Sequence, residues 1–276
     1  MNPLIGTSQL QELLDLGASI LICDCRFDLA QTLAGREAYA SGHIPGAIYV
    51  DLESDLSGGK TGANGRHPLP DPVVWAGTRQ RLGIDQHSHV VAYDSQGAVF
   101  ASRLWWMLRA VGLHKVQVLD GGLESWTGKM STAQLAPVAL EKRPTPVAYH
   151  GLVLVEEVLD NLASHHRTVV DARSPDRFHG RNETLDPVAG HIPGSLNRFY
   201  KCNQEAGTFK SPDRLRNEFS DMLASVQAND VIHTCGSGVT ACHNLLAMEY
   251  AGLSGSRLYA GSWSEWCADP QRPIEV

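Results

Sequence analysis

Residues 42–46 read GHIPG, and the same five residues return at 190–194. The offset from 42 to 190 is 148 residues, slightly more than half of the 276-residue chain. Solenoids repeat with periods of about 20–50 residues, so this longer period instead indicates two copies of one domain.

Further marks recur in the same order around the two pentapeptides. Residues 24–27 (DCRF) resemble residues 171–173 (DAR), and residues 119–126 (LDGGLESW) resemble residues 258–266 (LYAGSWSEW). Each half is long enough to bury its own core. We therefore expect domains at 1–130 and 150–276, joined by a linker at 131–149 that carries three prolines.

Short apolar runs alternate with amphipathic stretches in both halves. Continuous apolar runs are typical of strands buried on both faces of a parallel sheet. The alternation predicts an α/β fold in each half, a parallel sheet with helices on both faces. The expected strands are 19–23, 90–93, 116–119, 168–171, 231–235 and 257–259, and the expected helices are 98–111, 155–163, 214–223 and 239–250.

Charge and composition exclude several kinds of protein. The net charge is -7 and no basic run occurs, which argues against nucleic acid or an acidic membrane as the main partner. No apolar run approaches the roughly 20 residues of a membrane helix, and the first ten residues lack a signal-peptide pattern. We therefore expect a cytoplasmic enzyme. Six cysteines in a chain of this length predict free thiols and not a disulfide scaffold.

The segment 235–240 (CGSGVT) holds the candidate nucleophile. It follows an expected strand and precedes an expected helix, which is where ligands bind in open α/β sheets. Gly236 and Gly238 let the backbone curl, so that the N–H groups of the loop, up to Val239 and Thr240, converge on the Cys235 sulfur. The helix N-terminus adds partial positive charge. We expect this loop to stabilise a thiolate or a persulfide anion.

Cys235 has two alternative interpretations. A buried structural cysteine is disfavoured because the position and the loop chemistry coincide. A cysteine phosphatase needs an arginine that closes the loop around the phosphate, whereas Ala241 follows Thr240 and the loop contains no cation. In the first half, Asp94 stands where the cysteine would be, so that half is expected to be the non-catalytic copy.

Together these marks resemble the tandem-domain rhodanese family of sulfurtransferases over most of the chain. The marks are GHIPG twice, DAR, CGSGVTA at 235–241 and GSWSEW at 261–266. The resemblance implies two rhodanese-like domains, the second of them catalytic, and a cysteine persulfide intermediate. The neutral loop is similar to that of the 3-mercaptopyruvate branch, whereas thiosulfate-specific members resemble CRKGVT.

In the mercaptopyruvate branch, a loop serine acts with a histidine and an aspartate of the first domain. The resemblance assigns these roles to Ser237, His67 and Asp55, with Asp51 as the competitor of Asp55. It also assigns Arg177 to the substrate carboxylate. The branch has a second arginine further on, where this chain has residues 184–187 (TLDP), and Arg181 is the nearest substitute. Thiosulfate therefore stays open as an alternative donor.

The expected mechanism is covalent sulfur transfer. Cys235 attacks the sulfur of 3-mercaptopyruvate, Ser237 protonates the departing pyruvate enolate, and His67 with Asp55 orients the proton transfer. The acceptor is expected to be cyanide, a small thiol or a thioredoxin-like protein. No metal or organic cofactor is expected.

Other notable residues are interpreted mainly as structural. Cys23, Cys25 and Cys242 are expected to pack in the core, and the histidines of both GHIPG segments are expected to hold turns. Cys202 and Cys267 have no partner at the spacing of metal ligands. Either one, if exposed near the cleft, could serve as a redox switch.

Overall fold

The computed structural model describes all residues from Met1 to Val276. The chain divides into two compact units. The first contains Met1–Gly58 and Pro70–His150, and the second contains Gly59–Leu69 and Gly151–Val276. The predicted linker at 131–149 thus lies within the first unit, and the short segment 59–69 lies within the second. The predicted domain boundaries stay predictions.

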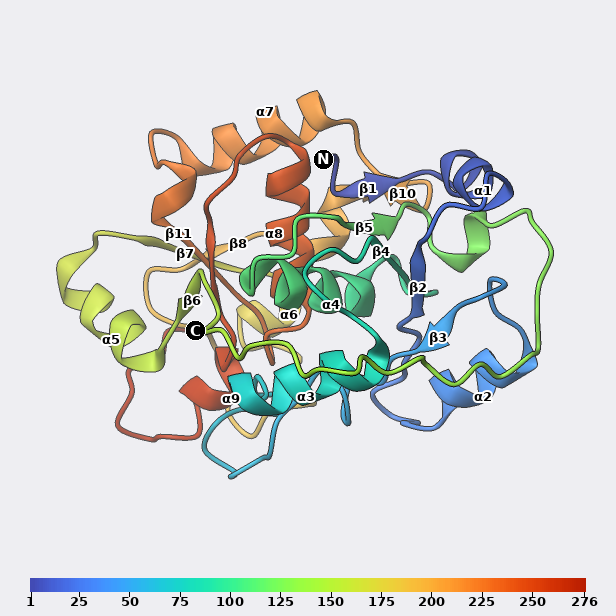
Figure 1. Cartoon of the computed structure of the whole chain (residues 1–276). Helices are drawn as coiled ribbons and strands as arrows, with labels where there is room; N and C mark the ends of the chain where they lie inside the picture. The colour runs from blue at the N-terminus through green and yellow to red at the C-terminus, as the bar shows by residue number, and fades with distance from the viewer. The chain divides into compact units, whose positions relative to one another are not determined.

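The first unit is built on a five-stranded parallel sheet with strand order β1-β5-β4-β2-β3. Its strands are each two or four residues long and are labelled in Figure 1. The elements of this unit are β1 (Leu4–Ile5), α1 (Thr7–Asp15), β2 (Leu21–Asp24), α2 (Ala34–Ser41), β3 (Ile48–Tyr49), α3 (Pro72–Leu82), β4 (Val90–Tyr93), α4 (Val99–Ala110), β5 (Val116–Leu119) and a 3-10 turn at Leu123–Ser125.

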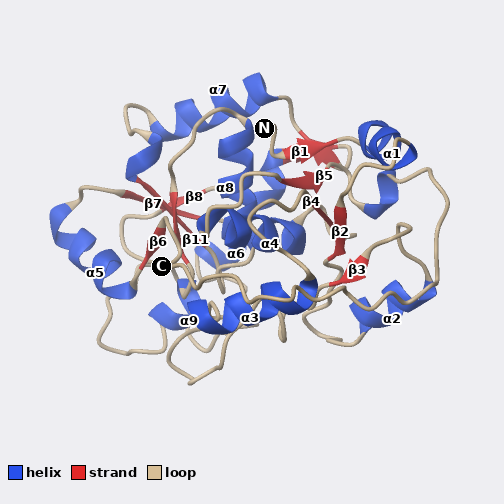
Figure 2. Cartoon of the chain, in the orientation of Figure 1, coloured by secondary structure: helices blue, strands red, loops and turns tan.

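The second unit repeats this topology with strand order β6-β12-β11-β7-β8, again all parallel. Its elements are β6 (Leu152–Val153), α5 (Val155–Ser164), β7 (Thr168–Asp171), α6 (Pro175–Phe178), β8 (Leu196–Asn197), a 3-10 turn at Tyr200–Asn203, the hairpin of β9 (Gln204–Glu205) and β10 (Thr208–Phe209), α7 (Pro212–Leu223), a 3-10 turn at Ala228–Asp230, β11 (Val231–Thr234), α8 (Thr240–Tyr250), β12 (Arg257–Tyr259) and α9 (Ser262–Trp266). The predicted fold class is confirmed, because both units are parallel sheets flanked by helices (Figure 2).

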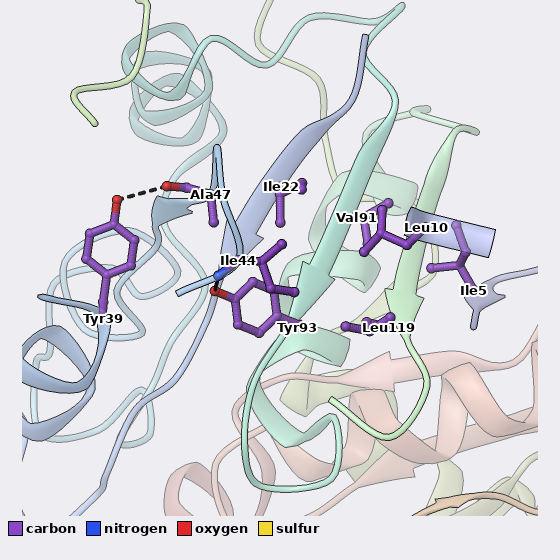
Figure 3. Close-up of a cluster of buried hydrophobic side chains, with 9 residues drawn as sticks. All are labelled: Ile5, Leu10, Ile22, Tyr39, Ile44, Ala47, Val91, Tyr93 and Leu119. Atoms are coloured by element: carbon purple, nitrogen blue, oxygen red, sulfur yellow. Dashed lines mark hydrogen bonds between the residues drawn. The ribbon is translucent and has the colours of Figure 1, made fainter. Parts of the chain in front are cut away.

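One face of the first sheet packs on a cluster of aliphatic and tyrosine side chains (Figure 3). Ile22, Val91 and Tyr93 come from the sheet, and Leu10 comes from α1. Tyr39 is buried with them and donates its hydroxyl to the carbonyl of Ala47, which ties α2 to the segment before β3 (Figure 3). Residues of β4 are fully buried on both faces, as a strand between helical layers requires.

The central strand of the second unit, β11, separates two helical layers. Ile232 packs in a cluster with Val158 of α5. Its neighbour His233 points to the other face, where its Nε2 lies 3.1 Å from Met248 Sδ on α8. Burial lowers the pKa of His233 to about 3, so the imidazole is neutral at physiological pH. The carboxyl end of β11 is therefore held between two apolar layers.

The two GHIPG segments have the same structural role in their own units. The ring of His43 stacks on Tyr39 at 4.0 Å, and its Nδ1 lies 2.7 Å from the Tyr39 carbonyl. The ring of His191 stacks on Phe178 at 3.7 Å, and its Nδ1 lies 2.8 Å from the Phe178 carbonyl. Each histidine thus fixes the turn to the preceding helix.

Candidate active site

Cys235 lies in the loop that joins β11 to α8. Its main-chain N–H donates to Ser262 Oγ at 3.0 Å, and its carbonyl accepts from the N–H of Trp263. The N–H of Gly238 donates to the Cys235 sulfur at 3.1 Å. Val239 and Thr240 follow as the cap and the first residue of α8. The sulfur therefore faces an amide donor of the loop and the N-terminus of a helix.

The two loop glycines are needed for different reasons. Gly238 has φ +75°, and a Cβ there would lie 2.2 Å from the Ala260 carbonyl oxygen. Both facts exclude a side chain. Gly236 has no such backbone requirement, but a Cβ there would lie 2.8 Å from Nη2 of Arg66 and 3.3 Å from Nη2 of Arg177. Two guanidinium groups thus lie against the residue that follows the cysteine.

Ser237 and His67 form a hydrogen-bonded pair. Ser237 Oγ lies 2.8 Å from His67 Nδ1, and both side chains are buried. His67 belongs to segment 59–69 of the second unit. The N–H of Arg66 donates to Ser264 Oγ at 3.0 Å and fixes that segment. Gly65 has φ +87°, and a Cβ there would lie 2.8 Å from the Gly261 carbonyl oxygen, so the close approach requires glycine. The predicted serine and histidine therefore meet beside Cys235.

Arg177 is held in the last turn of α6 by two carboxylates. Its Nε and Nη2 donate to Glu183 at 2.9 Å and 2.8 Å, and Nη2 also reaches Asp186 at 3.1 Å. Burial alone would raise the pKa of Glu183, but its hydrogen bonds with Arg177 and with backbone N–H groups hold that pKa below the usual value. The Glu183 carboxylate is therefore charged.

Arg66 lies at the loop, next to Gly236, and the sequence did not predict it. Its Nε and Nη2 donate to the two oxygens of Asp186 at 2.8 Å and 3.1 Å, a bidentate arrangement. The only signal in the sequence was its position next to His67. Arg181, the predicted second arginine, is exposed; its N–H donates to the Asp176 carbonyl, and its guanidinium makes no hydrogen bond or ion pair.

The predicted aspartates lie in the first unit. Asp55 accepts the N–H of Asp51 at 2.9 Å and forms an ion pair with Arg81. Burial raises the pKa of Asp55, although the Asp51 N–H and the charge of Arg81 oppose this shift. Asp51 accepts the N–H groups of Glu53 and Ser54. The role of Asp55 toward His67, and Asp51 as its competitor, stay predictions.

In the first unit, Asp94 follows β4 as Cys235 follows β11. Its carboxylate is fully buried and accepts four backbone N–H groups. The donors are Gln96 at 2.9 Å, Ala98 at 2.8 Å, Phe100 at 2.8 Å and Ala101 at 3.0 Å. The loop amides of this unit are thus satisfied by an internal carboxylate, which leaves no sulfur nucleophile there.

The remaining cysteines are free thiols. Cys23 and Cys25 are buried, and burial raises the pKa of both. Cys242 is fully buried and donates to the Gly238 carbonyl at 3.3 Å. Burial raises the pKa of Cys267, whereas Cys202 is exposed. Trp105, Trp106, Trp263 and Trp266 are buried.

The chain is similar to known proteins in both halves. The family description "Rhodanese-like domain" matches residues 7–129 and again 154–269. A probable 3-mercaptopyruvate sulfurtransferase of Pseudomonas aeruginosa is 42% identical over 264 residues, 92% of each chain. A putative thiosulfate sulfurtransferase of Mycobacterium tuberculosis is 35% identical over 278 residues, 98% of this chain and 96% of that one.

Among solved structures, 3-mercaptopyruvate sulfurtransferase from Leishmania major superposes with a TM-score of 0.84 at 30% identity. The match covers 95% of this chain and 74% of that one. No helix in the structure combines the length and the apolar character needed to cross a bilayer.

Proposed function

This chain belongs to the rhodanese family and is an enzyme of the sulfurtransferase kind, and we propose that it transfers sulfur from 3-mercaptopyruvate to an acceptor through a persulfide on Cys235. Such an enzyme uses a sulfur donor and a sulfur acceptor. The observation that carries the choice of donor is the 2.8 Å contact between Ser237 and His67, next to the nucleophile.

The nucleophile is the thiolate of Cys235. The Gly238 N–H already donates to this sulfur, and α8 presents its N-terminus to the same place. Both features stabilise negative charge on sulfur. The fully buried Cys242 points its thiol at the Gly238 carbonyl and has no part in the transfer.

The first step breaks the bond between carbon and sulfur in the donor. The Cys235 thiolate attacks the donor sulfur, a sulfur–sulfur bond forms, and the electron pair of the old bond leaves on carbon as the enolate of pyruvate. That carbon must gain a proton before pyruvate is released. Ser237 supplies the proton from Oγ, and the His67 ring, in hydrogen-bond contact with Oγ, supports its replacement.

The donor carboxylate binds to Arg177. The Nη1 group of Arg177 lies 3.5 Å from the position of a Cβ on Gly236, so it reaches the loop, and it makes no hydrogen bond in the structure. An unpaired guanidinium N–H is suited to a charge-assisted hydrogen bond with a carboxylate. The sequence predicts Arg181 as the second arginine that binds this carboxylate.

The second step returns the enzyme to its starting state. A nucleophilic acceptor attacks the outer sulfur of the persulfide, takes that sulfur, and leaves the electron pair on the Cys235 thiolate. Cyanide, a small thiol and a reduced thioredoxin-like protein all provide such a nucleophile. Until then the loop amides of Gly236, Gly238, Val239 and Thr240 stabilise the persulfide anion. Six free thiols suit a reducing compartment, so we propose the cytoplasm as the location.

Thiosulfate is the second candidate donor. Two guanidinium groups lie against the loop at Gly236, which gives a thiosulfate anion N–H donors as it does a carboxylate. The sulfite that leaves thiosulfate needs no proton on carbon, so the pair of Ser237 and His67 would have no task in that reaction.

The test is the catalytic efficiency, kcat/KM, of the wild-type enzyme with each donor at one acceptor concentration. We expect 3-mercaptopyruvate to be preferred by about tenfold or more, a difference of about 1.4 kcal/mol in transition-state free energy. Equal efficiency with both donors, or a preference for thiosulfate, would remove the donor assignment while leaving the sulfurtransferase class intact.

A further inference from the structure

Asp186 joins two arginines that come from different parts of the second unit. Arg66, in segment 59–69, binds both oxygens of its carboxylate, and Arg177, at the end of α6, binds Oδ2 at 3.1 Å. The Asp186 side chain is 1% exposed, whereas those of Arg66 and Arg177 are 29% and 19% exposed. The carboxylate therefore lies beneath the two cations and determines where they stand.

The two cations stand at the reactive loop. A Cβ on Gly236 would lie 2.8 Å from Arg66 Nη2 and 3.3 Å from Arg177 Nη2. Gly236 directly follows Cys235, so a donor that presents its sulfur to Cys235 meets both guanidinium groups. Loss of Asp186 would remove the link that keeps Arg66 and Arg177 together.

The charges of this cluster cancel. The positive charges come from three arginines, Arg66, Arg177 and Arg173, and the negative charges come from three carboxylates, Asp186, Glu183 and Asp171. All three carboxylate side chains are at most 2% exposed. Water does not screen buried charges as it screens surface charges, so these carboxylates act on an incoming anion. The cluster therefore offers N–H donors to an anion but carries no net positive charge.

We infer that Asp186, with Glu183, is a specificity-determining residue that favours a singly charged donor over a doubly charged one, and that Arg66, not Arg181, is the second cation of the donor site. This inference rests on the proposed function, because it concerns the donor of the same loop. A monocarboxylate gains hydrogen bonds from the free N–H groups and meets little repulsion. A dianion such as thiosulfate gains no net attraction from a neutral cluster, although removing its two charges from water costs more than removing one.

The primary test removes one negative charge with little change of shape. In Asp186→Asn, the ratio of kcat/KM with thiosulfate to kcat/KM with 3-mercaptopyruvate is expected to rise about fivefold, because a dianion gains more than a monoanion from each lost negative charge. Glu183→Gln removes the other carboxylate but keeps the bridge from Asp186, and the ratio is expected to rise in the same direction. If neither variant raises the ratio, the carboxylates do not select the donor.

Loss of a cation is expected to change the ratio of the two kcat/KM values in the opposite direction. Arg66→Gln removes a positive charge at the loop, so the ratio should fall and the KM for 3-mercaptopyruvate should rise about tenfold. Arg167→Gln is the matched control, because Arg167 has a similar exposed fraction, 26%, and pairs with one carboxylate, Glu157, away from the loop. The ratio in this control should equal that of wild type.

The competing hypothesis is that Arg181 is the second cation of the donor site. If Arg181→Gln changes the ratio and the KM more than Arg66→Gln does, the sequence-based choice is correct and the role given to Arg66 is wrong. Circular dichroism and the rate of Cys235 alkylation, measured for every variant, show that the fold and the loop are intact. Wild-type activity with 3-mercaptopyruvate is measured first, so that failure of the proposed function is recognised before any variant is compared.

Discussion

Asp94 and Cys235 stand at the same place in the two copies of the fold, each directly after the central strand of a five-stranded parallel sheet. Cys235 presents a sulfur to the amide of Gly238, whereas Asp94 uses its own carboxylate to accept four amides. The same loop therefore offers an amide to a sulfur in one copy, whereas its amides are satisfied by an internal carboxylate in the other.

Removal of the Asp94 carboxylate should destabilise the first unit. Asp94→Ala leaves four backbone N–H groups without their acceptor, and each buried, unsatisfied donor costs about 1–3 kcal/mol. We expect the free energy of unfolding to fall by about 3 kcal/mol or more in urea denaturation. Asp28→Ala is the matched control, because Asp28 also accepts two backbone N–H groups but is exposed to water. An equal loss in both variants would contradict the account.

Ser237→Ala should separate the two donors. The turnover of 3-mercaptopyruvate is expected to fall about a hundredfold, because general acid catalysis of this kind contributes about 10²–10⁴ in rate. Turnover with thiosulfate, assayed on the same preparation, serves as the internal control and should change far less. Equal losses with both donors would show that Ser237 supports the loop and does not deliver the proton.

The two loop glycines should respond differently to alanine. In Gly236→Ala the new methyl group meets the ends of two arginine side chains, which can move, so the KM for the donor should rise while the melting temperature stays near that of wild type. In Gly238→Ala the methyl group meets the backbone oxygen of Ala260, and φ is +75°, so both activity and melting temperature should fall. Calorimetry and steady-state assays distinguish the two; similar behaviour of both variants would contradict the geometry.

The loss of folding stability at low pH should depend on Glu218. Burial would raise its pKa, but hydrogen bonds from Lys210 and Arg198 lower it to about 2. A carboxylate whose folded-state pKa is depressed stabilises the fold above its ordinary pKa of 4.5 and loses that contribution as the pH falls toward 2. The free energy of unfolding of Glu218→Gln should therefore differ from wild type at pH 7 and converge with it by about pH 2.

The control for this pH dependence is Glu205→Gln. Glu205 pairs with Arg214, and both side chains are well exposed, 63% and 49%. An exposed ion pair contributes little and is screened by salt, so this variant should unfold almost as wild type does throughout the titration. A constant difference between wild type and Glu218→Gln over the whole range would show that the effect of Glu218 is packing and not charge.

The sequence was sufficient to predict the repeat, the parallel sheets and the loop between β11 and α8, because each depends on local pattern. The run Thr168–Asp171 became β7, and Arg257–Tyr259 became β12, with the predicted bounds. Helix α3 was not predicted, although its signals are local: Asp71 caps the first turn, Pro72 occupies its first position and Gly83 ends it in the left-handed region. The two-residue strands carry too little pattern to be recognised.

Arg66 could not be predicted because its role depends on tertiary placement. Segment 59–69 lies between two elements of the first half in sequence, yet it packs in the second unit. Asp186, the carboxylate that holds Arg66, lies 120 residues away. No spacing rule connects such a pair, so the sequence indicates only Arg181 as a second arginine, which is near Arg177 in sequence but exposed in the structure.

The most direct test of the central claim is mass spectrometry of the intact enzyme and its peptides after treatment with 3-mercaptopyruvate in the absence of an acceptor. We predict that one pyruvate is released per chain and that the peptide containing Cys235 gains the mass of one sulfur atom, which cyanide then removes. The Cys235→Ser enzyme should show neither change. Added sulfur on any other cysteine, or pyruvate release by Cys235→Ser, would contradict the account.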